Sequence, residues 1–283
     1  MERQNTSGMV KHAMMMMAGT FLSRILGLVR EVVVAAFFGA SRGLDAFNVA
    51  YTLANLARQL LAEGALSAAF VPVFSRALQE GRSRALSLAR GTMTVLLFAS
   101  SAAALAGILC APLLTRVMAP GFDPAAASLA SSLTRWMFPF LILISLAALT
   151  MGALNSLGSF FVPALAPAFS NLAFILTAPP FAARWGVHGL ALSVLCGGAM
   201  HFLTQWIWTF KIYPARPDLH DPDLRRIMAL FLPYAAGLSL NQVNPVVSRM
   251  LGSFLQEGSI SVLNYANRIL QLPLGLFVIA ISQ

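Results

Sequence analysis

The chain has 283 residues, of which 58% are hydrophobic and only 10% are charged, and it carries a formal net charge of +9. Soluble globular domains carry about 25% charged residues, so this composition excludes a fold whose surface faces water. The apolar runs are long and lack period-2 alternation, which predicts an all-α polytopic integral membrane protein rather than a β-barrel. In such a protein the positive charge indicates cytoplasmic loops or buried cations, not binding to nucleic acid.

The apolar segments follow one another along the whole chain. Roughly twenty apolar residues span a bilayer. We expect the first segment to be a retained helix rather than a signal peptide, and Glu63–Leu78 to extend the second segment. On this measure there are about eight segments, near 14–40, 45–62, 87–118, 133–157, 160–183, 187–212, 227–254 and 260–283.

Basic residues predict the orientation, because cytoplasmic loops of membrane proteins are enriched in Lys and Arg. With the N-terminus in the cytoplasm, the outer loops would hold only Arg42, Arg116 and Arg184. The cytoplasmic segments would hold many more, namely Arg3, Lys11, Arg76, Arg82, Arg84, Arg90, Lys211, Arg216, Arg225 and Arg226. We therefore expect a cytoplasmic N-terminus.

The first segment carries three charges, Arg24, Arg30 and Glu31, within eight residues. An Arg at the centre of a membrane helix costs about 2.5–3.5 kcal/mol on insertion scales, so such residues face a watery cavity or an internal partner. Arg24, Gly27 and Glu31 share one helix face, whereas Arg30 lies on another. A pair between Arg24 and Glu31 is a structural alternative, but it would leave Arg30 without a partner.

The second segment bears a polar stripe at helical spacing, which predicts either a hydrophilic cavity or a seam between helices. Arg58 lies off this stripe and needs its own partner. The stripe consists of Asp45, Asn48, Thr52, Asn55, Gln59 and Glu63. A similar set on the last segment is Asn264, Asn267, Arg268 and Gln271.

The predicted interior cations outnumber the interior anions, which calls for an anion from outside the chain. Guanidinium groups stay charged when buried and bind phosphate through two hydrogen bonds, so a phosphorylated amphiphile is the expected ligand; a charge-balanced bundle is the rival interpretation. No catalytic motif or metal-ligand spacing occurs, so we expect no enzyme and no cofactor. The cations are Arg24, Arg30, Arg58 and Arg268, and the anions are Glu31, Asp45 and Glu63.

Several stretches resemble the MurJ/MviN-type lipid II flippases of the multidrug/oligosaccharidyl-lipid/polysaccharide exporter superfamily. The resemblance runs from about residue 10 to the end of the chain. The stretches are SRILGLVRE (23–31), FGAS (38–41), DAF (45–47), NLARQLLAEGALSAAFVPVF (55–74), APGF (119–122), FPFLILISLAALTMGALNS (138–156) and YANRILQLPLG (265–275).

This resemblance implies two lobes around a cationic cavity, which export the undecaprenyl-pyrophosphate-linked peptidoglycan precursor lipid II across the bacterial inner membrane by alternating access. It implies that residues 1–212 form an N-terminal lobe of about six helices, 213–226 a cytoplasmic interlobe loop, and 227–283 the first two helices of a second lobe. It also implies substrate binding by the four interior arginines named above. Gating or cavity-lining roles follow for Glu31, Asp45, Asn48, Asn55, Glu63, Asn267 and Gln271.

The chain also departs from the family. Asn267 and Gln271 stand where many members carry Asp and Glu, which removes two acids beside Arg268. Alternating access needs two lobes around a central site, so we expect this chain alone not to transport. Two alternatives stay open: a flippase for another polyprenyl-linked saccharide, and a non-transporting truncated scaffold that recruits cell-wall synthesis enzymes.

Overall fold

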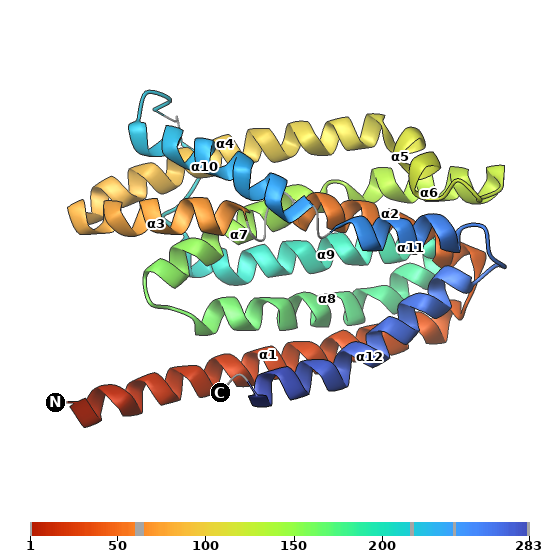
Figure 1. The fold of residues 1–283 in the computed structure, drawn as a ribbon, viewed down its shortest axis with the longest axis horizontal. Helices are drawn as coiled ribbons and strands as arrows, with labels where there is room; N and C mark the ends of the chain where they lie inside the picture. Colours follow the sequence, from red (N-terminus) through yellow and green to blue (C-terminus); the bar gives the residue numbers. More distant parts are fainter. Residues whose placement is uncertain (1, 60–64, 216–217, 240–241, 282–283) are drawn as a thin grey trace.

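The protein is described by a computed structural model that covers residues 2–59, 65–215, 218–239 and 242–281, with side-chain environments between residues 17 and 270. The described residues form helices joined by turns and short loops, with no strand (Figure 1). Four helical stretches in this part of the chain are long and apolar enough to cross a bilayer: Arg82–Leu109, Pro124–Ser156, Phe161–Trp185 and Val187–Thr209. The prediction of an all-α membrane fold is confirmed.

The N-terminal third contains three helices, α1 (Glu2–Phe38), α2 (Arg42–Arg58) and α3 (Ala65–Glu80). Helix α1 begins before the predicted segment 14–40. The Ser41 side chain caps α2 by accepting a hydrogen bond from the Leu44 N–H, with Oγ and N 3.3 Å apart. The stretch Glu63–Leu78, predicted to extend the second segment, lies mostly in the separate helix α3, while residues 60–64 are outside the described residues.

Two predicted single segments are each divided into two helices. Segment 87–118 corresponds to α4 (Arg82–Leu109) and α5 (Ala111–Met118), and segment 133–157 to the end of α6 (Pro124–Met137) followed by α7 (Phe140–Ser156). Pro112 lies in the first turn of α5, and Pro139 directly precedes α7. Proline lacks the N–H that would continue a helix and favours a first turn, so continuous hydrophobicity was a poor guide to helix ends here.

The remaining chain forms α8 (Phe161–Trp185), α9 (Val187–Trp206) and the short 3-10 helix η2 (Ile207–Thr209). Three more helices follow: α10 (Pro222–Ser239), α11 (Val243–Gly252) and α12 (Ser259–Ile281). The predicted segment 227–254 thus lies in two helices. Helix α10 begins at Pro222, inside the predicted loop 213–226.

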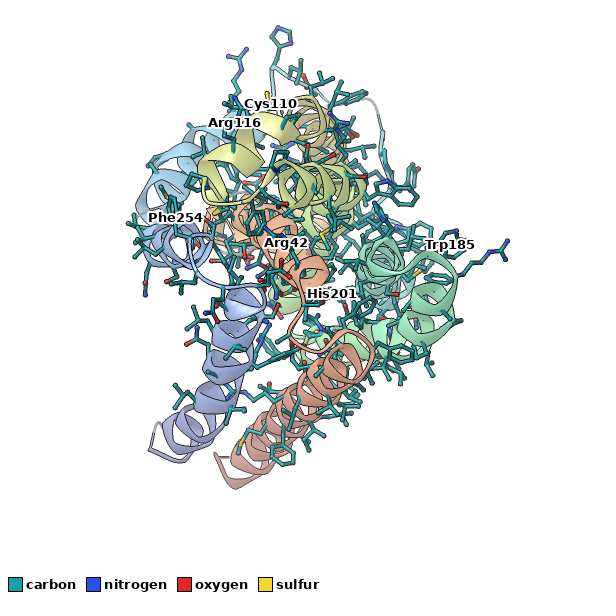
Figure 2. The ribbon with its side chains drawn as sticks, turned by 90° about the vertical axis from the view of Figure 1, so that its right-hand side faces the viewer. Arg42, Cys110, Arg116, Trp185, His201 and Phe254 are labelled. Atoms are coloured by element: carbon teal, nitrogen blue, oxygen red, sulfur yellow. The ribbon has the colours of Figure 1, made fainter. Side chains whose placement is uncertain are left out.

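Most helices run along the long axis of the molecule (Figure 1). Helix α8 packs between α1 and α9, α7 packs on α9, α2 packs on α6, and α10 packs on α3. The turn between α11 and α12 approaches α2, and α12 then runs back beside α1 (Figures 1 and 2). The predicted division into lobes at residues 212 and 227 stays a prediction.

Large apolar side chains remain on the outside of the bundle. Phe98 and Leu109 are both 71% exposed, Leu176 is 66% exposed and Leu113 is 62% exposed. In water, apolar surface on this scale would mark an interaction site or an aggregation hazard, whereas lipid solvates it without cost. Together with the apolar spans, this surface is that of a multi-pass membrane protein.

Candidate functional site

A small cavity lies between α1, α2, α8 and α12. Three of the predicted charged residues and one residue of the polar stripe line it: Arg30, Glu31, Arg268 and Asn48. The other lining residues are Val34, Leu44, Phe47, Tyr51, Phe174, Asn264 and Tyr265. Helices from the two ends of the sequence therefore share one polar wall.

One carboxylate serves two arginines in this cavity. Oε1 of Glu31 lies 3.6 Å from Nη2 of Arg30 and 3.4 Å from Nε of Arg268. The side chains of Glu31 and Arg30 are 11% and 17% exposed, so this contact is weakly screened by solvent, whereas the Arg268 side chain is 45% exposed. The alternative pair between Arg24 and Glu31 is wrong, since the Glu31 carboxylate turns to its neighbour in α1 and to α12 instead.

The guanidinium of Arg30 lies between two aromatic rings. Its Cζ is 4.9 Å from the ring centroid of Phe174 on α8 and 5.4 Å from that of Tyr51 on α2. Aromatic faces attract guanidinium groups, and they hold this plane in a fixed orientation. Sequence reasoning missed both rings, although Tyr51 lies three residues after Asn48 and so near the polar stripe.

Arg24 and Arg58 lie on the same two helices as Arg30 and Tyr51. Arg24 on α1 is half-buried, and within the described residues it forms no ion pair. Nε of Arg58 donates a hydrogen bond of 2.8 Å to Oδ1 of Asn55, one turn earlier on α2. Arg24 lies seven residues before Glu31 on α1, and Arg58 lies seven residues after Tyr51 on α2. Neither is therefore next to the Glu31 carboxylate in its helix.

The remaining predicted residues are unevenly described. Asn267 is exposed on α12. Glu63 lies outside the described residues, and Gln271 lies in α12 beyond the described side chains. Their predicted gating roles stay predictions.

Asp45 binds the beginning of α12. Its carboxylate accepts hydrogen bonds from the N–H of Gly258 (2.7 Å), the N–H of Ser261 (2.8 Å) and the hydroxyl of Ser261 (2.6 Å). Asn48 adds a hydrogen bond of 3.2 Å from its amide to the same hydroxyl oxygen. The Asp45 carboxylate and the groups that donate to it are buried. Because Gly258 has no side chain that could cap α12, Asp45 on α2 caps that helix instead.

Arg249 on α11 connects three helices. Its Nε donates to Oγ1 of Thr52 on α2 (3.1 Å), and its Nη2 donates to Oδ1 of Asn264 on α12 (3.0 Å). A third hydrogen bond reaches the carbonyl of Ile260 at 3.3 Å. The stripe residues Asp45, Asn48 and Thr52 therefore form a seam between helices, which is one of the two interpretations that the sequence left open.

The loops at this end of the molecule close over the seam. Arg42 forms ion pairs with Glu257 and with Asp123, the latter at 2.9 Å. Figure 2, which views this end, shows Arg42 near the middle and Arg116, Trp185 and Phe254 around the edge. The hydroxyl of Tyr265 also donates to the carbonyl of Gly39 at 3.1 Å.

Two glycines permit close main-chain contacts at the same end. A Cβ on Gly258, whose φ is +85°, would lie 2.6 Å from the carbonyl oxygen of Ala40. A Cβ on Gly121 would lie 2.6 Å from the carbonyl oxygen of Ser253. Any larger residue would force the α11–α12 turn away from the earlier loops.

A second set of ion pairs lies at the opposite end. Arg84 near the start of α4 binds Asp221 through two hydrogen bonds of 2.5 and 2.8 Å, and Asp223 through one of 2.6 Å. The guanidinium of Arg84 lowers the pKa of the Asp221 carboxyl below its usual value. These bonds hold the beginning of α10 against the α3–α4 turn (Figure 1).

Comparison with known proteins identifies the family. A family model described as lipid II flippase MurJ matches residues 34–283. The lipid II flippase MurJ of Burkholderia cenocepacia is 37% identical over 276 residues, which cover 93% of this chain and 53% of that protein. The probable lipid II flippase MurJ of Vibrio cholerae is 39% identical, with coverage of 97% and 55%. The chain spans about half the length of these curated relatives.

Comparison with solved structures indicates the same family. A structure of lipid II flippase MurJ in an inward closed conformation matches with a TM-score of 0.79 and 29% identity, covering 93% of this chain and 56% of that one. An inward-facing MATE family transporter of the MOP superfamily matches with a TM-score of 0.70 at 19% identity, which shows a shared fold alone. The chain belongs to the lipid II flippase MurJ family.

Proposed function

We propose that this chain forms one lobe and the start of a second in a transporter that moves lipid II from the inner to the outer leaflet of the bacterial inner membrane. The observation that carries the proposal is the single Glu31 carboxylate between Arg30 and Arg268. Two guanidinium groups on one carboxylate leave an excess positive charge at this cavity. A pyrophosphate from the substrate would supply the missing negative charge.

The chemistry of the cavity suits a pyrophosphate. Arginine stays charged in a low-dielectric site and can bind a phosphate through two parallel hydrogen bonds. The rings of Tyr51 and Phe174 fix the plane of Arg30, which lowers the entropy lost on binding. Arg24 and Arg58 on the same helices would extend the basic wall toward the other end of the molecule.

Alternating access requires that one end of the cavity is closed while the other is open. Among the described residues, the hydrogen bonds that involve Asp45, Asn48 and Arg249 join α2 to α11 and α12 at the end that carries the α11–α12 turn. We assign this end to the outer side and place the N-terminus in the cytoplasm, because the basic residues Arg76, Arg82 and Lys211 belong to the opposite end. The hydrogen-bonded seam would then be the outer gate.

Genetic complementation tests the proposal. The gene product that contains residues 1–283 is expressed in a bacterium depleted of its own lipid II flippase. We expect growth with the natural sequence and loss of growth with Arg30→Gln, because the neutral side chain keeps hydrogen bonding but removes the charge that binds pyrophosphate. Arg116→Gln, which removes an exposed charge on α5, is the matched control and should support growth.

Growth with Arg30→Gln at normal expression would contradict the proposal. Substrate choice is tested separately by binding of lipid II and of undecaprenyl phosphate to the purified protein. Tighter binding of lipid II is expected. Equal binding would favour a transporter for other polyprenyl-linked saccharides.

A further inference from the structure

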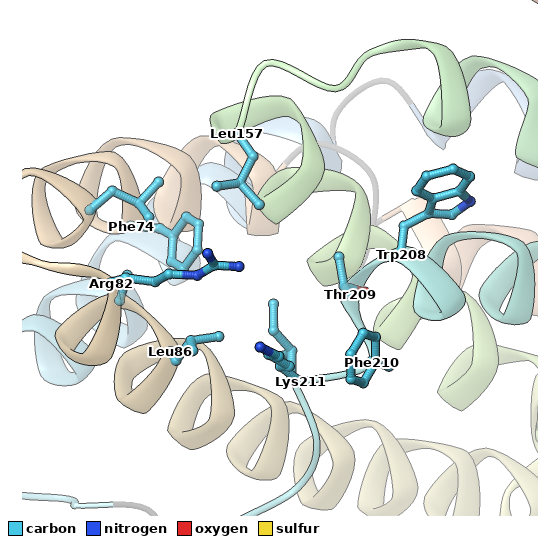
Figure 3. A pocket seen from close by; sticks show the side chains of 11 residues that line it. Phe74, Arg82, Leu86, Leu157, Trp208, Thr209, Phe210 and Lys211 are labelled. Carbon is cyan, nitrogen blue, oxygen red and sulfur yellow. The ribbon is translucent and has the colours of Figure 1, made fainter.

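A second pocket lies at the basic end of the molecule, where the α3–α4 turn, the end of α7 and the segment after α9 meet (Figure 3). Its volume is about 210 Å³. Its lining residues come from α3, from α4, from Leu157 after α7 and from residues 208–212, and none is shared with the cavity around Glu31. The residues that matter here are Phe74, Arg82, Leu157, Trp208, Phe210 and Lys211.

Two cations without an acidic partner face this pocket. Figure 3 shows the side chains of Arg82, from α4, and of Lys211, from the segment after η2, among the side chains that line it. Both residues are exposed, and within the described part of the chain neither forms an ion pair. Nearby Arg84 differs, because Asp221 and Asp223 already neutralise it. The pocket therefore combines two available positive charges with a mostly apolar wall.

The segment that carries Lys211 is held in place by its own hydrogen bonds. The carbonyl of Lys211 accepts from Nε of Arg90 at 2.9 Å, and the carbonyl of Ile212 accepts from Nε1 of Trp206 at 3.1 Å. Thr94 accepts from the N–H of Ala215 at 2.8 Å. Binding of an anion would thus cost little conformational entropy, because the backbone of this segment is already ordered.

The rim of the pocket is apolar and exposed. Trp208 is 67% exposed, Phe210 is 60% exposed and Leu157 is 57% exposed. Aromatic residues beside cations are typical of the boundary between membrane and water, where a lipid phosphate and its acyl chains separate. The two cations of the pocket therefore match the phosphate of an anionic lipid, and the apolar rim matches its acyl chains.

We propose that this pocket binds the phosphate of an anionic phospholipid of the phosphatidylglycerol class from the surrounding leaflet. Arg82 and Lys211 contact the phosphate, while Trp208 and Leu157 contact the acyl chains. This site does not depend on the proposed transport function, since it shares no residue with the cavity around Glu31. A free phosphate would leave the apolar rim without a partner.

Lipid titration of the purified chain in an uncharged detergent tests the proposal. Bound lipid is counted by native mass spectrometry with phosphatidylglycerol, phosphatidylcholine and a polyprenyl pyrophosphate, while thermal protection is measured with the same lipids and with inorganic phosphate. We expect phosphatidylglycerol to bind most tightly. Each surface cation contributes about a fivefold effect, so Arg82→Gln with Lys211→Gln should weaken binding by about 25-fold.

Two matched variants make the result decisive. Arg116→Gln with Arg226→Gln removes the same charge from exposed positions outside the pocket and should bind normally. Arg82→Lys with Lys211→Arg keeps both charges and should also bind. Retained binding by the Gln double variant, equal binding of phosphatidylcholine, equal protection by inorganic phosphate, or preferential binding of the polyprenyl pyrophosphate would each overturn the assignment.

A spectroscopic measurement locates the acyl chains. Phosphatidylglycerol with brominated chains quenches nearby tryptophan fluorescence, and the chain has four tryptophans. Lipid in this pocket should saturate its quenching at a low lipid concentration. Because Trp208 lies on the rim, Trp208→Phe should remove most of that quenching. Unchanged quenching in this variant would place the lipid elsewhere and overturn the proposal.

Discussion

Arg30 and Arg268, which are far apart in the sequence, both contact the buried carboxylate of Glu31. Glu31 contacts both Arg30 and Arg268, while Phe174 and Tyr51 cover the faces of the Arg30 guanidinium. At an effective dielectric constant of 20, a charge pair about 4 Å apart interacts by about 4 kcal/mol, so a new anion must compete with Glu31 for the same two groups. Glu31 thus already supplies a negative charge to both arginines.

Glu31→Gln is therefore expected to raise the affinity of the cavity for a polyprenyl pyrophosphate by about tenfold, or about 1.4 kcal/mol. The amide keeps the size of the side chain but no longer neutralises the arginines. Affinity is measured by native mass spectrometry. Glu80→Gln, at an exposed position on α3, is the control and should leave affinity unchanged. Weaker binding in Glu31→Gln would mean that the carboxylate positions the arginines instead.

At the scale of elements, α12 depends on α2 for its first turn. The residue before α12 is Gly258, which has no side chain to accept from the free N–H groups, and Asp45 accepts from two of them. The positive end of the helix dipole also favours a carboxylate there. The first turn of α12 is consequently held to α2 in part by one buried carboxylate.

Asp45→Asn should loosen this contact by about 1–3 kcal/mol, because the amide offers one acceptor oxygen and no charge. The opening is measured by maleimide labelling of Ile260→Cys, a position that is 1% exposed, after Cys110 and Cys196 are replaced by Ser. We expect labelling to be about tenfold faster, as a shift of 1.4 kcal/mol implies.

Asp218→Asn is the matched control for this measurement, because Asp218 accepts a hydrogen bond only within the exposed loop before α10. Its labelling rate should equal that of the parent. An unchanged rate in Asp45→Asn would show that the seam does not depend on the carboxylate.

The sequence predicted the face of α2 that matters but not what covers it. Helical spacing placed Asp45, Asn48 and Thr52 together, and composition made their exposure to lipid untenable. The partner Ser261 lies more than two hundred residues later, and no local pattern connects the two positions. For Arg249 the sequence left two interpretations open, a polar role inside the bundle and a side chain that extends to the membrane surface from near a helix end.

Helix boundaries were harder to predict than helix faces. The apolar run 133–157 gives no change of composition at Pro139, where α6 gives way to α7. Burial explains this, because Leu133, Met137 and Leu141 are all fully buried and the run is apolar on both sides of the break. Hydrophobicity indicates that a segment lies in the membrane, whereas the position of the helix break depends on the N–H that Pro139 lacks.

At the scale of the molecule, the last three helices are attached to the earlier ones at both ends. The seam around Asp45 holds α11 and α12 at one end, and Arg84 holds the start of α10 at the other through Asp221 and Asp223. Rearrangement at the seam can therefore leave the Arg84 contact in place. This second attachment depends on pH, since the pKa of Asp221 is lower in the folded chain.

Asp221→Asn should lower the Tm of the purified chain at pH 7, because it removes a carboxylate that Arg84 binds through two hydrogen bonds. A depressed folded pKa stabilises the fold above the ordinary aspartate pKa of about 3.9, and that stability is lost as the pH falls through the folded value. The Tm difference from the parent should therefore shrink in acid. A difference that is constant from pH 7 to pH 3 would contradict this account.

The contact between the α11–α12 turn and the first loops is made mainly by the backbone. Asp45 binds main-chain N–H groups, and Gly258 approaches the main-chain oxygen of Ala40. Side chains of this turn that make no such contact, unlike those of Glu257 and Ser261, can consequently change during evolution without opening this end of the molecule. A saturation library would show tolerance at the turn positions that make no contact and a sharp minimum at Gly258, whose main-chain N–H binds Asp45, 213 residues earlier in the chain.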